Sequence, residues 1–225
     1  DSTGLGLLSF APDRLSYDPG ITISGHDKMG WTTTLGYDDG KDDALVKFVP
    51  FASKQIRSIG TYAVASGTEI DIWIYDEFDG SNLGGLLGSL SGRYCEHAGY
   101  HTFDLPEPVY VSSGDDYFVK ATYNTGTKYP IPCERNTSNT EIADSGWCWV
   151  SSDGSSWFPL GNGLYERDVC IKTYGKIGDQ YLKAHFYAEP TSGIVPLTVE
   201  FTDSSVGDVS SWQWDFNGDG AVDAT

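Results

Sequence analysis

The chain has 225 residues, which is enough for one complete domain and part of a second. Its 14 basic and 32 acidic side chains give a formal net charge of -18, which disfavours contact with phosphate backbones and anionic lipid head groups. No nucleic acid partner is therefore expected. The acidic side chains, 27 glycines and 14 tyrosines are typical of a soluble, β-rich surface protein, and adaptation to high salt is the alternative explanation of the charge.

The sequence predicts no membrane span, because no run approaches the roughly 20 apolar residues that a spanning helix needs. A secretory leader with a basic start is not recognisable either, so we expect a mature or excised chain. The uncharged segment Leu5–Phe10 is too short to span a membrane. We interpret it as a first strand, or as a strand donated to a neighbouring molecule.

Apolar and polar residues alternate repeatedly along the chain, whereas helical periodicity is nearly absent. In Thr68–Tyr75, three isoleucines alternate with polar and aromatic residues, which is the pattern of a half-buried strand. Clusters of Asp, Asn and Gly separate such segments and are typical of turns. The pattern predicts an all-β fold, a jelly-roll-like β-sandwich. The other predicted strands in this part are Ala44–Val49, Ile56–Ala65, Tyr100–Leu105, Asp116–Tyr123, Trp147–Ser151 and Asp168–Tyr174.

The cysteines form an even set that lacks the paired short spacing of a zinc site. This spacing favours two disulfides and an oxidising compartment. Among the possible pairings we expect Cys95 with Cys133 and Cys148 with Cys170, because each couple would join segments that flank the same strands. The acceptor sequence Asn-Thr-Ser at Asn136 is consistent with glycosylation of an exported chain.

Oxygen-bearing side chains are concentrated near the C-terminal end of the chain. Their spacing matches the first, third, fifth and ninth positions of a calcium loop, with Gly220 at the sixth, and the twelfth position would lie beyond the last residue. A calcium ion here would relieve the dense negative charge, and the alternative is a turn that needs no metal. A polar turn at Asp76–Asn82 is a second, weaker calcium candidate. The four predicted ligands are Asp215, Asn217, Asp219 and Asp223.

Residues 184–220 resemble the first half of a PKD domain, the immunoglobulin-like module named after the polycystic kidney disease protein. The resemblance rests on the PTSG turn, the PLTVEFTD strand and the WDF-N-G-D-G ending, which stand in family order. It implies an extracellular spacer or adhesion module with no catalysis of its own. Only three strands are predicted, so this immunoglobulin-like β-sandwich would be incomplete, with open sheet edges. They are Ala184–Ala188, Leu197–Phe201 and Ser211–Phe216.

A larger segment, from about Met29 to Tyr174, resembles the lectin-like β-sandwich of surface proteins in methanogenic archaea and some bacteria. That domain follows papain-like peptidase domains or stands among PKD repeats. The resemblance implies glycan binding but supplies no ligand residues. It rests on GWTTTLGY at Gly30–Tyr37, IRSIGTYAVASGTEIDIWIY at Ile56–Tyr75, AGYHTFDLPEPVYVSSGDDYFV at Ala98–Val119, YPIPCE at Tyr129–Glu134 and DVCIKTY at Asp168–Tyr174.

The sequence gives little support for catalysis. Gly146–Trp149 superficially resembles the surroundings of a papain-like cysteine, but only His185 follows Cys148, so the histidine and amide partners of that chemistry are missing. Neighbouring acids such as Asp38 and Asp39 would point to opposite faces of a strand or lie in solvated turns. We therefore predict that the chain is not an enzyme.

Four tryptophans are candidate glycan-binding residues, because their flat apolar faces match sugar rings while turn acids and amides would bind the hydroxyl groups. Core packing is the alternative for each of them. Trp147 and Trp149 are expected on one strand face, which suits a core layer or an exposed platform. The candidates are Trp31, Trp147, Trp149 and Trp157.

The predicted organisation is an N-terminal extension or first strand (1–25), a lectin-like jelly-roll domain (26–176), a linker (177–183) and a partial PKD domain (184–225). We predict a secreted or cell-surface, non-enzymatic protein with an adhesive or architectural role. Self-association by strand donation is one expected mode of assembly. The alternative is a carbohydrate-binding module accessory to a secreted peptidase. Cell-surface glycans or other surface proteins are the expected partners.

Overall fold

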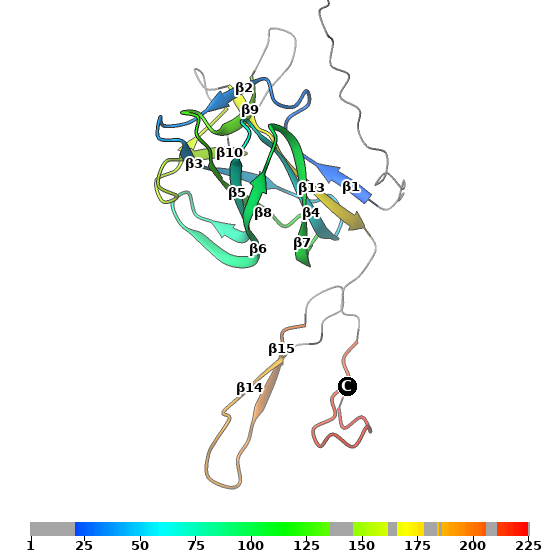
Figure 1. Cartoon of the computed structure of the whole chain (residues 1–225). Helices are drawn as coiled ribbons and strands as arrows, with labels where there is room; N and C mark the ends of the chain where they lie inside the picture. The colour runs from blue at the N-terminus through cyan, green and yellow to red at the C-terminus, as the bar shows by residue number, and fades with distance from the viewer. Residues whose placement is uncertain are drawn as a thin grey trace, which may run out of the picture.

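The regular structure of the described residues is entirely β (Figure 1). The computed structural model describes residues 21–135, 146–161, 166–177, 184, 186–205 and 211–224. A six-stranded and a four-stranded antiparallel sheet enclose one hydrophobic core, to which both contribute. The predicted all-β sandwich is confirmed. Asn136 and the segment Leu5–Phe10 lie outside the described residues.

The six-stranded sheet has the order β11-β10-β3-β8-β5-β6. Its strands alternate as the sequence pattern requires: Ile70, Ile72 and Ile74 of β5 are fully buried, and the residues between them face outward and stay partly exposed. The strands are β3 (Lys41–Phe48), β5 (Thr68–Phe78), β6 (Leu83–Cys95), β8 (Tyr117–Asn124), β10 (Cys148–Ser151) and β11 (Phe158–Pro159).

The four-stranded sheet has the order β1-β13-β4-β7 and faces the first sheet across the core. Two hydroxyl pairs join the sheets inside the core: Thr61 with Tyr123 at 2.6 Å and Thr173 with Tyr117 at 2.9 Å. Because β3, β5 and β8 belong to one sheet and β4, β7 and β13 to the other, the chain crosses the core repeatedly, in a jelly-roll-like manner. The strands are β1 (Ile21–Ser24), β4 (Lys54–Ala63), β7 (Gly99–Val111) and β13 (Ile171–Ile177).

Two smaller sheets complete the described structure. A three-stranded sheet, β12-β9-β2, lies at one end of the sandwich, where Figure 1 labels β2 and β9. A separate sheet pairs β14 with β15 in the C-terminal part, and its Phe186 and Phe201 rings pack with Trp214 at 5.5 and 6.0 Å. The strands are β2 (Thr33–Leu35), β9 (Ile131–Arg135), β12 (Arg167–Val169), β14 (Phe186–Glu189) and β15 (Glu200–Asp203).

The C-terminal strands differ from their predicted positions. The strand predicted at Leu197–Phe201 lies instead at β15, and Ser211–Phe216 contains only an isolated bridge from Trp214 to Ala224. Both predictions relied on short runs of apolar residues. The side chains of these runs are largely exposed, so no buried face determines where a strand begins and ends in this part of the chain.

The predicted disulfides do not form: Cys95, Cys133, Cys148 and Cys170 are all buried, free thiols. Cys95 ends β6 in the six-stranded sheet, whereas Cys133 lies on β9 in the three-stranded sheet. Cys148 pairs in register with Val46 on β3, whereas Cys170 lies in the connection between β12 and β13, outside the sheet that holds Cys148. Burial raises the pKa of the Cys148 thiol well above its ordinary value, because it disfavours the charged thiolate.

Candidate functional site

The four predicted glycan-binding tryptophans do not form one surface. Trp31 precedes β2 and its ring faces Tyr62 of the four-stranded sheet, with centroids 6.1 Å apart. Trp147 immediately precedes β10 and packs against His26 at 4.9 Å and against the edge of the core. It therefore does not share a surface with Trp149, although the alternation of a strand predicted that it would.

Trp149 and Trp157 lie together on the outer face of the six-stranded sheet. Both rings contact Phe78 edge-on, at centroid distances of 5.1 and 6.0 Å. The Lys120 ammonium group lies between two indoles, 5.0 Å from the Trp73 ring and 5.9 Å from the Trp157 ring. These contacts describe a packed aromatic layer with cation–π stabilisation, in which each ring already has neighbours.

The loop between β10 and β11 covers part of this layer. Gly154 lies so close that a Cβ atom there would come within 2.9 Å of Lys120 Nζ and 3.1 Å of Asp43 Oδ2. Lys120 also forms an ion pair with Asp43 at 3.1 Å beneath the loop. The outer face of the six-stranded sheet is therefore largely filled by its own side chains.

An aromatic strip lies over the outer face of the four-stranded sheet and is formed by Tyr62, Tyr100 and Tyr174 of that sheet and by Trp31, which contacts Tyr62. Tyr62 and Tyr100 are cross-strand partners with centroids 4.8 Å apart, and the Tyr100 and Tyr174 hydroxyls share a hydrogen bond of 2.7 Å. Gly60 makes room for both rings, because a Cβ atom there would lie 2.0 Å from Tyr100 Oη. All four side chains of the strip remain partly exposed.

A cleft of about 500 Å³ opens at the end of this strip. It coincides with two breaks in strand register, one between Ile56 and Ser58 of β4 and one between Tyr174 and Gly175 of β13. Both ladders break at Arg57, which is the extra residue opposite β13 and points away from the core, as expected of a β-bulge. The cleft is lined by Ile21, Arg57, Ser58, Asp104, Leu105, Pro108, Tyr174 and Gly175.

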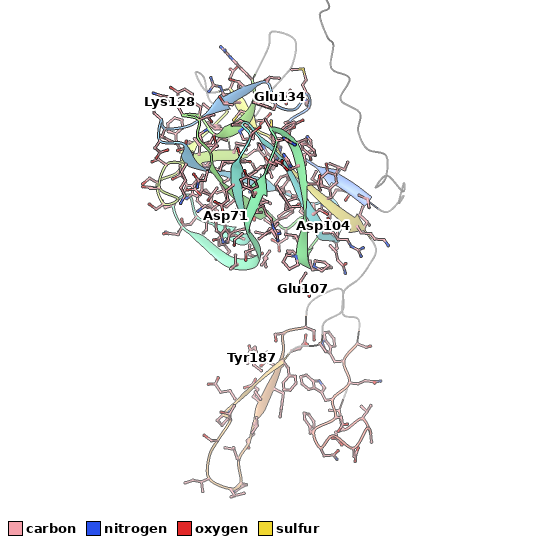
Figure 2. All side chains as sticks on the ribbon, in the orientation of Figure 1. Asp71, Asp104, Glu107, Lys128, Glu134 and Tyr187 are labelled. Atoms are coloured by element: carbon pink, nitrogen blue, oxygen red, sulfur yellow. The ribbon has the colours of Figure 1, made fainter. Side chains whose placement is uncertain are left out.

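The third wall of the cleft comes from β7. Between Asp104 and Val109 this strand inserts four residues opposite Arg57 alone, so it bulges outward. The Ser58 hydroxyl donates to Asp104 Oδ1 at 2.9 Å, which holds the carboxylate at the rim. Figure 2 labels Asp104 and Glu107 on this side of the sandwich and Asp71 on the side of the six-stranded sheet.

Buried charges fix the loop that presents Trp31. Lys172 Nζ donates to Asp27 Oδ2 at 2.7 Å, and the fully buried Glu134 carboxylate accepts from the backbone N–H of Met29 at 3.0 Å. Burial raises the pKa of Asp27, although the Lys172 ammonium group opposes this change. The position of Trp31 in the strip is thus set by contacts that are shielded from water.

Many side-chain oxygens of the predicted calcium loop accept hydrogen bonds from within the loop itself. Asp215 accepts from backbone amides at Asn217, Gly218 and Gly220, and these bonds lower the pKa of its carboxyl group. Asp223 Oδ2 accepts from a backbone amide at 2.8 Å, and Asp219 Oδ2 from the Asn217 side chain at 3.1 Å. Within the described residues, no group of three or more His, Cys, Asp or Glu side chains is arranged to hold a metal ion. A calcium ion at Asp215, Asn217, Asp219 and Asp223 stays a prediction.

The weaker calcium candidate forms a tight turn between β5 and β6. Asp79 Oδ1 accepts from the backbone amides of Ser81 and Asn82, at 2.8 and 2.7 Å. This arrangement is the hairpin turn that the sequence left as the alternative.

The chain belongs to the Lectin like domain family, whose model matches residues 23–175 and so covers most of the sandwich. No curated protein matches the chain. Across the part of the chain that the structure describes, no helix has the length and apolar character needed to cross a membrane.

Two solved structures share the fold. One contains the cysteine protease and lectin-like domains of Cwp84, a surface layer associated protein of Clostridium difficile, and matches with a TM-score of 0.53 at 12% identity. The other is the clostridial cysteine protease Cwp84 after propeptide cleavage, with a TM-score of 0.57 at 12% identity. Each match covers 72% of this chain but only 37% and 41% of those chains, respectively. At this identity the likeness concerns the fold alone.

The sequence alone did not indicate the residues that line the cleft. Arg57, Asp104 and Tyr174 come from three strands and meet only through the register breaks. One local signal was present: Pro106 and Pro108 follow the predicted strand Tyr100–Leu105, and prolines within a strand favour a bulge or an edge.

Proposed function

We propose that the chain is a non-catalytic, cell-surface module that binds carbohydrate at the cleft and along the aromatic strip. The observation that carries the proposal is the continuity of the cleft with partly exposed rings, since Tyr174 belongs to both. A sugar ring in the cleft would stack on Tyr174 while Arg57 and Asp104 bind its hydroxyl groups. The rest of the strip would receive the neighbouring sugars of a chain.

Membership in a lectin-like family supports this proposal. The surface-layer association of Cwp84 supports a location outside the cell, and its protease domain supports a role as an accessory to a secreted peptidase. Neither comparison supplies the ligand, so the proposal rests on the geometry of the cleft.

Binding of the full chain to a panel of polysaccharides tests the proposal. We expect Tyr174→Ala to lower the affinity for the selected glycan by at least about tenfold, which corresponds to about 1.4 kcal/mol of binding free energy, because the substitution removes the stacking surface. Trp157→Ala is the matched control on the opposite sheet and should bind normally. If Trp157→Ala weakens binding and Tyr174→Ala does not, the binding site lies on the six-stranded sheet instead. Failure of the chain to bind any glycan would overturn the proposal.

An adhesive or architectural role for the C-terminal part is a second candidate. Phe186 and Tyr187 of β14, together with Phe216 of the C-terminal loop, are about half exposed, at 54, 57 and 53%. Such a surface favours association with another sheet, as the PKD resemblance and strand donation would require. A bound calcium ion would rigidify the adjoining acidic loop.

A further inference from the structure

A lysine and an aspartate from distant parts of the sequence meet beneath the loop that follows β1. Lys172 lies on β13 and Asp27 lies in that loop, 145 residues away in the sequence. The Lys172 ammonium group donates to Asp27 Oδ2 at 2.7 Å and to the Asp27 backbone carbonyl at 2.9 Å. Because Ser24 of β1 pairs with Thr173 of β13, the loop begins beside Lys172. The sheet therefore holds the amine against one carboxyl group.

The Asp27 carboxyl group is shielded from water. Its side chain is fully buried, whereas that of Asp43, in the ion pair with Lys120, is 10% exposed. The backbone of Gly25 passes over the pair, since a Cβ atom there would lie 3.2 Å from Lys172 Nζ and 3.4 Å from Asp27 Oδ1. The Oδ1 atom has no hydrogen-bond partner among the described residues. These contacts therefore compensate the desolvation of a negative charge on Asp27 only in part.

The surroundings of Asp27 favour its neutral form. Burial raises the pKa of Asp27, and the negative charge of Glu134 acts in the same direction, although the Lys172 ammonium group opposes both. Glu134, which Figure 2 labels, is itself fully buried and accepts from the backbone N–H groups of Lys28 and Met29. Transfer of a proton along the hydrogen bond from Lys172 to Asp27 would replace two buried charges by a neutral amine and a neutral acid.

We propose that Lys172 and Asp27 condense to an amide that joins Nζ to Cγ. The ammonium group passes one proton to Oδ2, and the neutral nitrogen attacks Cγ. The C–N bond forms, the Cγ–Oδ2 bond breaks, and a second proton from the nitrogen leaves with Oδ2 as water. The reaction consumes no oxidant or reductant. Two groups held in contact react with an effective molarity of about 10⁵ M or more, and exclusion of water protects the product from hydrolysis.

The amide would tie the loop after β1 to β13 covalently. Asp27 and Lys172 lie close to the two ends of the segment that matches the family model, residues 23–175. A force applied to both ends of the domain would pass through the bond and would not extend the 145 residues between them. This property suits a surface module that connects other domains. The inference goes beyond glycan binding and does not depend on it.

The intact mass of the reduced, denatured full chain tests the bond. We expect a mass below that of the sequence by one water molecule, and a branched tryptic peptide that contains both Asp27 and Lys172. Lys172→Arg should show the full mass of its sequence, because a guanidinium group keeps the charge but is never deprotonated to a nucleophile. Lys120→Arg, in the ion pair with Asp43 on the other sheet, is the matched control and should still lack one water.

Glu134→Gln tests the contribution of the second buried carboxylate. Glutamine keeps a carbonyl oxygen for a backbone N–H group but removes the negative charge. In mass spectra taken at intervals after synthesis, the form that lacks water should therefore accumulate at least about threefold more slowly than in the wild type. An equal rate in a variant with an unchanged near-UV circular dichroism spectrum would contradict this role of Glu134.

The outcomes separate the inference from the proposed function. A wild-type mass equal to that of the sequence would overturn the amide and leave glycan binding intact. Loss of water that persists in Lys172→Arg would also overturn it, and peptide mapping would then place the loss elsewhere, such as a cyclic imide at Asp39-Gly40. A chain that carries the amide and binds no glycan would support the inference and overturn the proposed function alone.

Discussion

At the scale of single residues, the molecule buries several charges and gives each a different partner. Glu134 is fully buried and accepts backbone N–H groups, whereas Lys54 relies on one hydroxyl. Asp42 is also fully buried, and its Oδ2 atom accepts from the backbone N–H of Tyr37 at 3.0 Å. Its other carboxylate oxygen has no hydrogen-bond partner among the described residues, so these contacts compensate desolvation of the charge only in part.

The environment of Asp42 makes the stability of the sandwich depend on pH. Burial, together with the negative charges of Asp39 and Asp43, raises its pKa from 3.8 to about 6. Between these values the native state binds more protons than the unfolded state, so stability falls as the pH rises and is constant above about 6. The contribution is at most about 3 kcal/mol.

Asp42→Asn should remove this dependence. We expect the free energy of unfolding of the variant, relative to the wild type, to increase between about pH 4 and 6 and to level off above, as measured by urea denaturation. Asp115→Asn, which removes one carboxylate at an exposed position, is the control variant. A flat difference for Asp42→Asn would show that this carboxyl group titrates as in the unfolded chain.

At the scale of the elements, register decides where the site lies. The central strand β4 pairs with β13 on one side and β7 on the other, and both ladders break at Arg57. Three residues further on, Gly60 leaves the space in which the Tyr100 and Tyr174 rings lie over the sheet. The bulge opens the cleft, and the glycine allows the strip to reach it.

Gly60→Ala tests the role of this space. The new Cβ atom would lie 2.0 Å from Tyr100 Oη and 2.9 Å from Tyr174 Cε2, so the rings must move and their hydroxyl contact must change. We expect a loss of about 1–3 kcal/mol in stability by chemical denaturation and weaker glycan binding. Gly126→Ala, at a position with open space around it, should be nearly neutral, and an equally neutral Gly60→Ala would contradict the close packing of the two tyrosine rings on Gly60.

The sequence predicted the strands whose alternation is strong and missed those defined by context. Thr68–Tyr75 lies within β5, because three isoleucines enter the core there. Strand β6 was missed because its four glycines and exposed leucines follow no period of two. The cleft could not be predicted, because it depends on which residues of separate strands are neighbours. The free cysteines could not be foreseen either, since an even number of cysteines without zinc-site spacing occurs both with disulfides and with buried thiols.

At the scale of the whole molecule, the described residues form two hydrophobic clusters. The large core uses residues from Ala44 to Ile171, between the two sheets of the sandwich. The small cluster joins Phe186, Phe201, Trp214 and Phe216 around β14 and β15. Figure 1 shows the β14-β15 hairpin outside the two sheets that enclose the large core. Since no residue of the small cluster belongs to the large one, the stability of the sandwich should not depend on the C-terminal part.

Removal of residues 184–225 tests this independence. We expect the shortened chain to keep the thermal melting temperature of the sandwich transition within about 2 °C, because its core loses no buried side chain. Its affinity for the selected glycan should also be unchanged, since every residue that lines the cleft lies between Ile21 and Gly175. Tyr174→Ala in the same shortened chain is the binding control. A drop of more than about 4 °C, equivalent to about 1 kcal/mol for a domain of this size, would show that the C-terminal part packs on the sandwich and stabilises it.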